Sequence, residues 1–263
     1  MARSQSGSTG QLLQLCAGYF ISYVLTGMLV KYFNVVILPT RIHDVDAALL
    51  KMLDYADELI RARRIEPKDD LVTRLAQAVN EEQGVSEETI RASIAGLVFA
   101  GHETTKNQLG WMVAVLSEVP GEWDRVAKEP ARAANVVEEV LRFRSTATSI
   151  GRLALEDVEI CGVRIPANST VIASLWSANR DAAEFPRPDE IAVDENRAGV
   201  QVAFGQGAHH CLGAALARAE LQESLIALTQ RMHCPKLEPG AEYLPPIGIN
   251  GPIKLPISFV PRA

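Results

Sequence analysis

The chain has 263 residues, of which 48% are hydrophobic and 22% charged, the composition of a packed globular protein with one large domain or two smaller ones. Its formal net charge of −6 argues against a polyanion such as nucleic acid as a partner. The four cysteines lie far apart and form no CxxC pair, which favours reduced thiols and a cytoplasmic location over a disulfide scaffold.

The first 40 residues are predicted to be an atypical apolar segment. Within them, Leu12–Val30 is a run of about 19 residues without a charge, close to the length that spans a bilayer. Gln14, Ser22 and Thr26 dilute its hydrophobicity, and single charges on both sides set no orientation. Two interpretations stay open: membrane association through residues 12–30, or a helix buried in the protein or against a partner.

Helices are expected to follow. Apolar residues three or four apart predict one helix over 44–64 and a second over 69–80. Ser86, followed by two glutamates, is typical of the N-cap of a third helix. No residue breaks that helix before Pro120, so it is expected to contain roughly 33 residues and to be ~50 Å long. A fourth helix is predicted over 131–144.

The pattern then changes from helical to extended. Residues 158–175, "VEICGVRIPANSTVIASL", alternate and are rich in β-branched side chains with turn signals, which predicts short hairpin strands. The proline-rich residues 185–197 predict an irregular segment. A last helix is expected from Cys211 to about Arg231, with short strands after it. The predicted fold is mainly α with a minor component of antiparallel hairpins.

The stretch "FGQGAHHCLGAALARAE", residues 204–220, points to chemistry. A cysteine that begins a helix lies at the positive end of the helix dipole, which favours the thiolate form. Gly205 and Gly207 allow a tight turn that directs backbone N–H groups at the sulfur. The small residues that follow Cys211 leave room for a flat, wide ligand against the helix. A thiolate held by amides beside a flat apolar surface suits the axial ligation of a haem iron.

The loop has four other interpretations. Most free cysteines are inert core residues. A zinc site from His209, His210 and Cys211 is unfavourable because adjacent residues rarely converge on one tetrahedral ion. "GQGAHH" begins like a dinucleotide fingerprint but lacks its third glycine and a βαβ context. A redox-active thiol is the fourth. The complete motif favours the haem ligand over all four.

The motif resembles the cysteine signature of the bacterial-type cytochrome P-450 family of haem-thiolate monooxygenases, Phe-Gly-x-Gly-x-His/Arg-x-Cys-x-Gly. Its fixed places are filled by Phe204, Gly205, Gly207, His209, Cys211 and Gly213. The resemblance implies that residues 41–263 form a haem domain with the C-terminal two-thirds of that fold. It also implies haem b (iron protoporphyrin IX) as the cofactor, Cys211 as the axial iron ligand and His209 as a partner of a haem propionate.

Further motifs occur in the order that the family shows. "AGHETT", residues 100–105, lies within the long predicted helix, where a threonine hydroxyl can bond the backbone a turn earlier and distort the helix into a groove. The resemblance gives Glu103 and Thr104 the role of a proton relay. "EEVLR" places Glu139 and Arg142 on one helix face. The family buries this pair as a structural network and adds an arginine, which Arg197 matches.

The resemblance also supplies binding positions. Arg152 matches a propionate-binding arginine, and Gln201 occupies a place where bacterial members often carry a propionate-binding histidine. A neutral amide still binds a propionate, but more weakly than a cation does. The residues expected to line the substrate pocket are mostly apolar: Leu97, Ala100, Ile150 and Ile247.

The predicted function is a monooxygenase that inserts one oxygen atom of O2 into a small organic substrate. Because no flavin or pyridine-nucleotide motif is present, electrons are expected from NAD(P)H through ferredoxin and ferredoxin reductase partners. The chain is roughly a third shorter than typical family members, with the loss expected at the N-terminal end. We therefore expect a second copy or residues 1–40 to cover the open face. The alternative is a non-catalytic haem-binding or partner-binding remnant of the fold.

Overall fold

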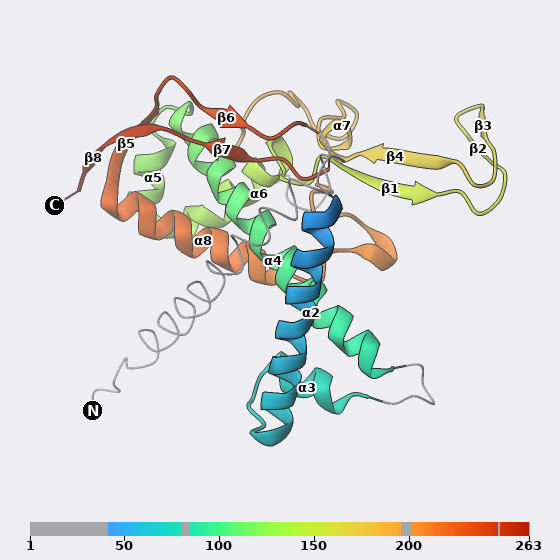
Figure 1. Ribbon diagram of the computed structural model, residues 1–263. Coiled ribbons are helices and arrows are strands. Elements are labelled where there is room, and N and C mark those ends of the chain that lie inside the picture. The colour runs from blue at the N-terminus through green and yellow to red at the C-terminus, as the bar shows by residue number, and fades with distance from the viewer. Residues whose placement is uncertain (1–41, 80–84, 196–200, 247, 263) are drawn as a thin grey trace, which may run out of the picture. The chain divides into compact units, whose positions relative to one another are not determined.

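The computed structural model describes residues 42–79, 85–195, 201–246 and 248–262 (Figure 1). The chain divides into two compact units, residues 1–103 and 104–263. The described part of the first unit is helical, and that of the second holds helices and small antiparallel sheets. The predicted fold class is therefore confirmed.

The first unit contains α2 (Ile42–Ile65), α3 (Leu71–Gln77) and the first part of α4 (Glu87–Ser117). The predicted cap at Ser86 is found, and the structure shows a second cap at Asp70. The Ser86 hydroxyl accepts the backbone N–H of Thr89 at 3.1 Å at the start of α4. The Asp70 carboxylate accepts that of Thr73 at 2.8 Å at the start of α3. This hydrogen bond, with further help from Arg63, holds the pKa of Asp70 below its ordinary value.

The core of the first unit is built from side chains one helical turn apart. This spacing puts them on one face of each helix, as the apolar pattern predicts. An ion pair between Arg91 of α4 and Asp57 of α2, at 3.0 Å, lies at the edge of this core. The buried apolar cluster comprises Ala56, Ile60, Ala76, Ile90 and Ile94.

The second unit packs the rest of α4 with α5 (Glu122–Lys128), α6 (Ala133–Phe143) and α8 (Ala214–Arg231) (Figure 1). A 3-10 turn at Pro130–Arg132 precedes α6, and α7 (Leu175–Ala178) is a single turn. Each long helix contributes fully or almost fully buried side chains to one core, among them Met112, Leu116, Trp123, Val126, Val136, Val137, Val140, Leu221 and Leu225.

All three tryptophans lie in the second unit. Trp111, Trp123 and Trp176 each donate the indole N–H to a backbone carbonyl outside their own helix, at 3.3, 2.8 and 2.7 Å. The Arg144 guanidinium lies 4.8 Å from the Trp111 ring and 4.9 Å from the Trp176 ring. These contacts fix the indoles by both their apolar rings and their polar edges.

The strands pair in antiparallel twos. The first two pairs are β1 (Ser149–Leu153) with β4 (Thr170–Ser174), and β2 (Val158–Ile160) with β3 (Val163–Ile165). β2 and β3 form the outer end of an arm whose inner part is β1 and β4 (Figure 1). The predicted hairpins are confirmed, whereas β1 precedes the predicted strand region.

The C-terminal strands form two further pairs. β5 (Met232–Leu237) pairs with β8 (Ile257–Pro261), and β6 (Glu242–Tyr243) with β7 (Pro252–Lys254). The β5–β8 register shifts between His233 and Lys236. The short strands expected after the last helix are therefore confirmed.

Helix α4 approaches β7 closely at a glycine. A Cβ atom added to Gly110 would lie 2.4 Å from Cγ of Pro252, closer than non-bonded carbon atoms approach each other in proteins. The neighbouring Gly251 shows the same crowding, because its added Cβ would lie 2.4 Å from Cβ of Asn107. The hydrogen at each position lets backbone and side chain come together.

Among the helices of the described ranges, none is both long and apolar enough to cross a membrane. Residues 1–40, including the run at 12–30, lie outside the described residues.

Candidate functional site: the cysteine loop

The residues before α8 fold into a compact loop around Cys211. Gly205 and Gly207 adopt φ angles of 69° and 73°, in the left-handed region that favours glycine. The backbone N–H of Cys211 donates to the carbonyl of Phe204 at 2.9 Å, and that of His210 to Gly207 at 3.0 Å. The tight glycine turn expected from the sequence is thus present, and backbone hydrogen bonds close it.

The prediction that the last helix begins at Cys211 is wrong. Helix α8 begins at Ala214, with Gly213 as its N-cap. The N–H of Cys211 closes the loop onto Phe204, and its carbonyl accepts the N–H of Ala214 at 3.3 Å. The cysteine therefore precedes the first helical turn, and the loop backbone positions it more directly than the helix dipole does.

The Cys211 thiol is free and exposed, which excludes the interpretation as an inert core cysteine. Two large apolar side chains close to it in sequence are also exposed, Leu212 at 83% and Leu216 at 60%. A Cβ added to Gly213 would lie 4.0 Å from the sulfur. An accessible thiol among exposed apolar side chains has the chemistry that a large, flat, apolar ligand with a thiolate-binding metal requires. These residues therefore fit a haem.

Side-chain contacts from α6 and α8 hold the residues at the start of the loop. The Arg218 guanidinium of α8 lies 4.5 Å from the Phe204 ring, and its Nε donates to Glu138 of α6 at 2.5 Å. Gln201 donates to the same carboxylate at 3.0 Å and accepts the N–H of Ala203 at 2.7 Å. Both ends of the Gln201 amide are thus engaged within the protein.

Asn179, at the end of α7, also fixes the loop. Its side-chain oxygen accepts the backbone N–H of Val202 at 2.7 Å, and its backbone carbonyl accepts Nη1 of Arg142 at 3.0 Å. Asn179 is fully buried. It therefore connects the cysteine loop to the network of Arg142, a role that the sequence pattern did not single out.

The Glu139–Arg142 pair is buried as the resemblance implied. Arg142 donates to the two Glu139 oxygens at 2.8 and 2.9 Å, with side-chain exposures of 0% and 3%. Arg142 also donates to the carbonyls of Pro188 and Glu190, each at 2.8 Å. The pair thereby holds the irregular segment, whose proline-rich residues 185–195 contain no helix or strand. Arg197 lies outside the described residues.

The proposed proton-relay residues lie inside an unbroken helix. Every residue of α4 from Glu87 to Ser117 is α-helical, so the expected distortion at "AGHETT" does not interrupt the helix. Glu103 is buried and Thr104 half-buried. The next residue, Thr105, hydrogen-bonds through its hydroxyl to the carboxyl group of Glu220 in α8. Burial raises the pKa of Glu220, and the Thr105 bond opposes part of that rise.

The remaining predicted residues are placed as follows. His209 lies exposed in the 3-10 turn Gly207–His209, and Arg152 lies exposed on β1, where it donates to the adjacent carbonyl of Gly151 at 2.8 Å. The predicted pocket residues are a half-buried Leu97 and an exposed Ala100 in the first unit, a half-buried Ile150 in the second, and Ile247, which lies outside the described residues.

The family description "Cytochrome P450" matches residues 11–238, and the chain belongs to this family of haem-containing monooxygenases. The match begins inside the apolar N-terminal segment and crosses the boundary expected at residue 40.

Curated relatives from bacteria agree with this assignment. Luteothin monooxygenase of Streptomyces thioluteus is 36% identical over 217 residues, which are 82% of this chain and 53% of the relative. Vitamin D(3) 25-hydroxylase of Pseudonocardia autotrophica is 41% identical over 180 residues, 67% of this chain and 44% of the relative. The chain spans about half the length of the curated relatives that it matches.

Solved structures show the same fold over most of the chain. P450BioI, in complex with an acyl carrier protein that carries hexadec-9Z-enoic acid, matches with a TM-score of 0.82 at 29% identity. That match covers 90% of this chain and 62% of the other. CYP109Q5 from Chondromyces apiculatus matches with a TM-score of 0.78 at 32% identity, and the match covers 84% of this chain and 57% of the other.

Proposed function

We propose that this chain provides the haem-thiolate centre of a monooxygenase that inserts one oxygen atom of O2 into a small organic substrate. The observation that carries the proposal is the exposed Cys211 thiol in a backbone-closed glycine loop, within a chain of the cytochrome P450 family. Relatives whose names describe a monooxygenase and a hydroxylase support the same class of reaction.

The residues that would hold haem b come from the loop and from β1. Cys211 would bind the iron through Sγ, and the exposed side chains of His209 and Arg152 would donate hydrogen bonds to the propionates. Gln201 would assist only with the part of its hydrogen-bonding capacity that Glu138 and Ala203 leave. Haem, when bound, supplies the oxygen-activating chemistry.

Helix α4 would supply protons. Glu103 and Thr104 are consecutive residues in a partly buried stretch, where they would pass a proton toward the reacting oxygen. Two electrons would come from NAD(P)H through a ferredoxin and its reductase, and the second oxygen atom would leave as water. The substrate would be a small, mostly apolar organic molecule.

A second copy of the chain would cover the substrate side, and the protein would act in the cytoplasm. A non-catalytic haem-binding or partner-binding role is the second candidate, because the chain spans about half of each relative and activity belongs to the whole protein. Haem binding and turnover are therefore tested separately.

Haem ligation is tested by the spectrum of the reduced, carbon monoxide-bound protein. We expect a strongly red-shifted Soret band in the wild type, reconstituted with hemin where necessary, and its loss in Cys211→Ser. Cys161→Ser is the matched control, since Cys161 is also a free, exposed thiol. An identical band in Cys211→Ser, or a well-folded protein that takes up no haem, would overturn the proposal.

Proton delivery is tested by the coupling of product formation to oxygen consumption with an accepted substrate. We expect Thr104→Ala to lower this coupling and to slow product formation by about 100-fold. Ser93→Ala on the same helix is the control, because it also removes a hydroxyl, one that bonds the carbonyl of Thr89 at 2.7 Å. Unchanged coupling in Thr104→Ala would contradict the relay. Bound haem without turnover in any variant would favour the non-catalytic role.

A further inference from the structure

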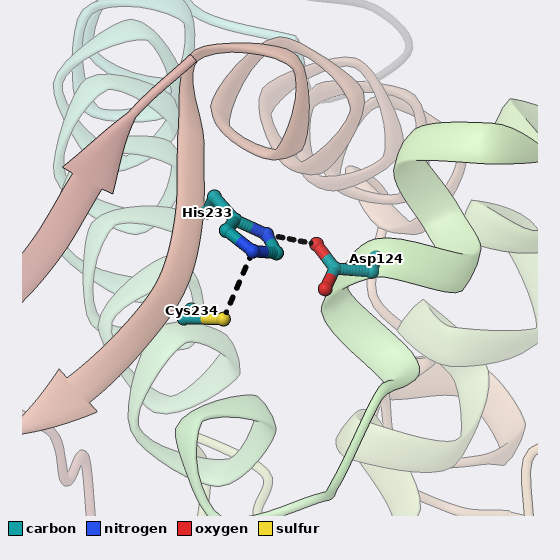
Figure 2. A group of neighbouring side chains, drawn as sticks. All are labelled: Asp124, His233 and Cys234. Carbon is teal, nitrogen blue, oxygen red and sulfur yellow. Dashed lines mark hydrogen bonds and ion pairs between the residues drawn. The ribbon is translucent and has the colours of Figure 1, made fainter.

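A second group of chemically active side chains lies on α5 and β5, in the second unit. Nδ1 of His233 is 2.6 Å from Oδ1 of Asp124, and Nε2 of the same ring is 3.2 Å from Sγ of Cys234 (Figure 2). Each residue offers one ligand atom, and these atoms all lie within 4.8 Å of one another. The cysteine is free and exposed.

The backbone brings these neighbours together in an unusual way. Adjacent side chains on a strand normally point to opposite faces of the sheet. Here β5 changes register between His233 and Lys236, and Cys234 adopts a φ of 48°, which is uncommon for a residue other than glycine. The bulge turns the Cys234 thiol to the side on which the His233 imidazole lies (Figure 2).

The orientation of the imidazole is the one that metal-binding histidines adopt. Such histidines donate one ring N–H to a carboxylate and present the other nitrogen to the metal. Bond lengths of about 2.0–2.1 Å to nitrogen and about 2.3 Å to sulfur separate the two ligand atoms of a tetrahedral zinc ion by roughly 3.5 Å. The observed separation of 3.2 Å between Nε2 and Sγ is close to that value.

We infer that Cys234 and His233 form a binding site for zinc or a similar borderline-soft divalent cation, distinct from the cysteine loop. Sγ of Cys234 and Nε2 of His233 are the protein ligands, and water completes the coordination sphere, since the His233 side chain is 41% exposed. A nitrogen–sulfur pair selects zinc over magnesium and calcium, which prefer oxygen.

Asp124 is a positioning residue in this site. Its carboxylate also accepts a hydrogen bond from Arg262, which lies 3.3 Å from Nδ1 of His233. This cation neutralises the carboxylate. Asp124 therefore acts on the metal through the histidine, by fixing its ring and its tautomer.

The first test is alkylation of the wild-type protein by iodoacetamide with and without Zn²⁺, resolved by peptide mass spectrometry. We expect Zn²⁺ to slow the modification of Cys234 at least about tenfold, because a coordinated sulfur is a poor nucleophile. Cys161 is an exposed free thiol in the same molecule and is the internal control. Equal rates at Cys234 with and without Zn²⁺ would overturn the inference.

The second test is equilibrium dialysis against Zn²⁺, with thermal unfolding measured in parallel. We expect Cys234→Ser to bind about one equivalent less than the wild type and Cys161→Ser to bind as much as the wild type. Undiminished binding in Cys234→Ser would contradict the site.

Two variants distinguish the effect of the Asp124–His233 hydrogen bond on zinc affinity from that of the Asp124–Arg262 ion pair. We expect Asp124→Asn to weaken the affinity for Zn²⁺ about 10–100-fold, the usual effect of losing a carboxylate behind a metal-bound histidine. Arg262→Gln breaks the same ion pair but leaves the bond between Asp124 and His233, so it should not weaken binding. Equal losses in the two variants would show that Asp124 acts through Arg262 and not through the histidine.

Discussion

Arg142 donates hydrogen bonds to both carboxylate oxygens of Glu139, one helical turn away, and the two side chains are almost completely buried. Removing one partner leaves a buried charge without compensation, so we expect Glu139→Ala to lower the free energy of unfolding by about 3–5 kcal/mol. The measurement is urea denaturation followed by circular dichroism.

The control for this prediction is an exposed pair with the same spacing. Arg187 and Glu190 are 3.0 Å apart with side-chain exposures of 58% and 60%. Glu190→Ala should therefore cost less than about 1 kcal/mol, because solvent screens exposed ion pairs. Similar losses in Glu139→Ala and Glu190→Ala would contradict the assignment of a structural role to the buried network.

Gly110→Ala tests the close approach of α4 to Pro252. Alanine alone would favour the helix by about 0.5–1 kcal/mol. The added Cβ would overlap the proline ring, however, and overpacking of this kind costs about 1–3 kcal/mol. We expect a net loss of stability. Gly96→Ala in the same helix meets no atom within 4 Å and should be stabilising. A stabilised Gly110→Ala would refute the close contact.

Glu220 should make stability depend on pH. Its folded-state pKa is raised above the ordinary 4.5, mainly by burial. The folded protein therefore holds this proton more tightly than the unfolded chain does. The resulting stabilisation is fully present below pH 4.5, the ordinary pKa of the group. It is lost as the pH rises through the folded-state pKa. Glu220→Gln should abolish this loss and be more stable than the wild type at pH 7, measured by denaturation at several pH values.

Two variants sharpen this prediction. Thr105→Val removes the hydroxyl that opposes the rise, so it should move the loss of stability to higher pH. Glu223→Gln on the same helix is the control, because Glu223 is exposed, and it should keep the wild-type pH profile. A wild-type profile in Glu220→Gln would show that Glu220 is not the group responsible.

Local signals allowed much of the fold to be predicted. The apolar spacing of α2 and the Ser86 cap of α4 are properties of a few neighbouring residues, and the structure places both elements where these signals indicate. Helix α5 was missed because it has no such signal. It lies between two prolines, its N-cap is Gly121 without a side-chain hydrogen bond, and burial of Trp123 and Val126 stabilises it.

The same distinction applies to the site. The cysteine loop was recognisable because its fixed positions are contiguous in the sequence. The contacts that hold it were not, since Gln201 bonds a carboxylate 63 residues away and Asn179 bonds a backbone N–H 23 residues away. The Asp124–His233 bond joins residues 109 positions apart. Only the folded chain brings such pairs together.

The distribution of the indole rings has a practical consequence for anyone who follows this protein in solution. Since every tryptophan belongs to residues 104–263, tryptophan emission reports on that unit alone. Far-ultraviolet ellipticity also includes helices α2 and α3. Melting curves from the two optical signals will superimpose if the two units unfold together. A difference between their midpoint temperatures will show that the units unfold independently.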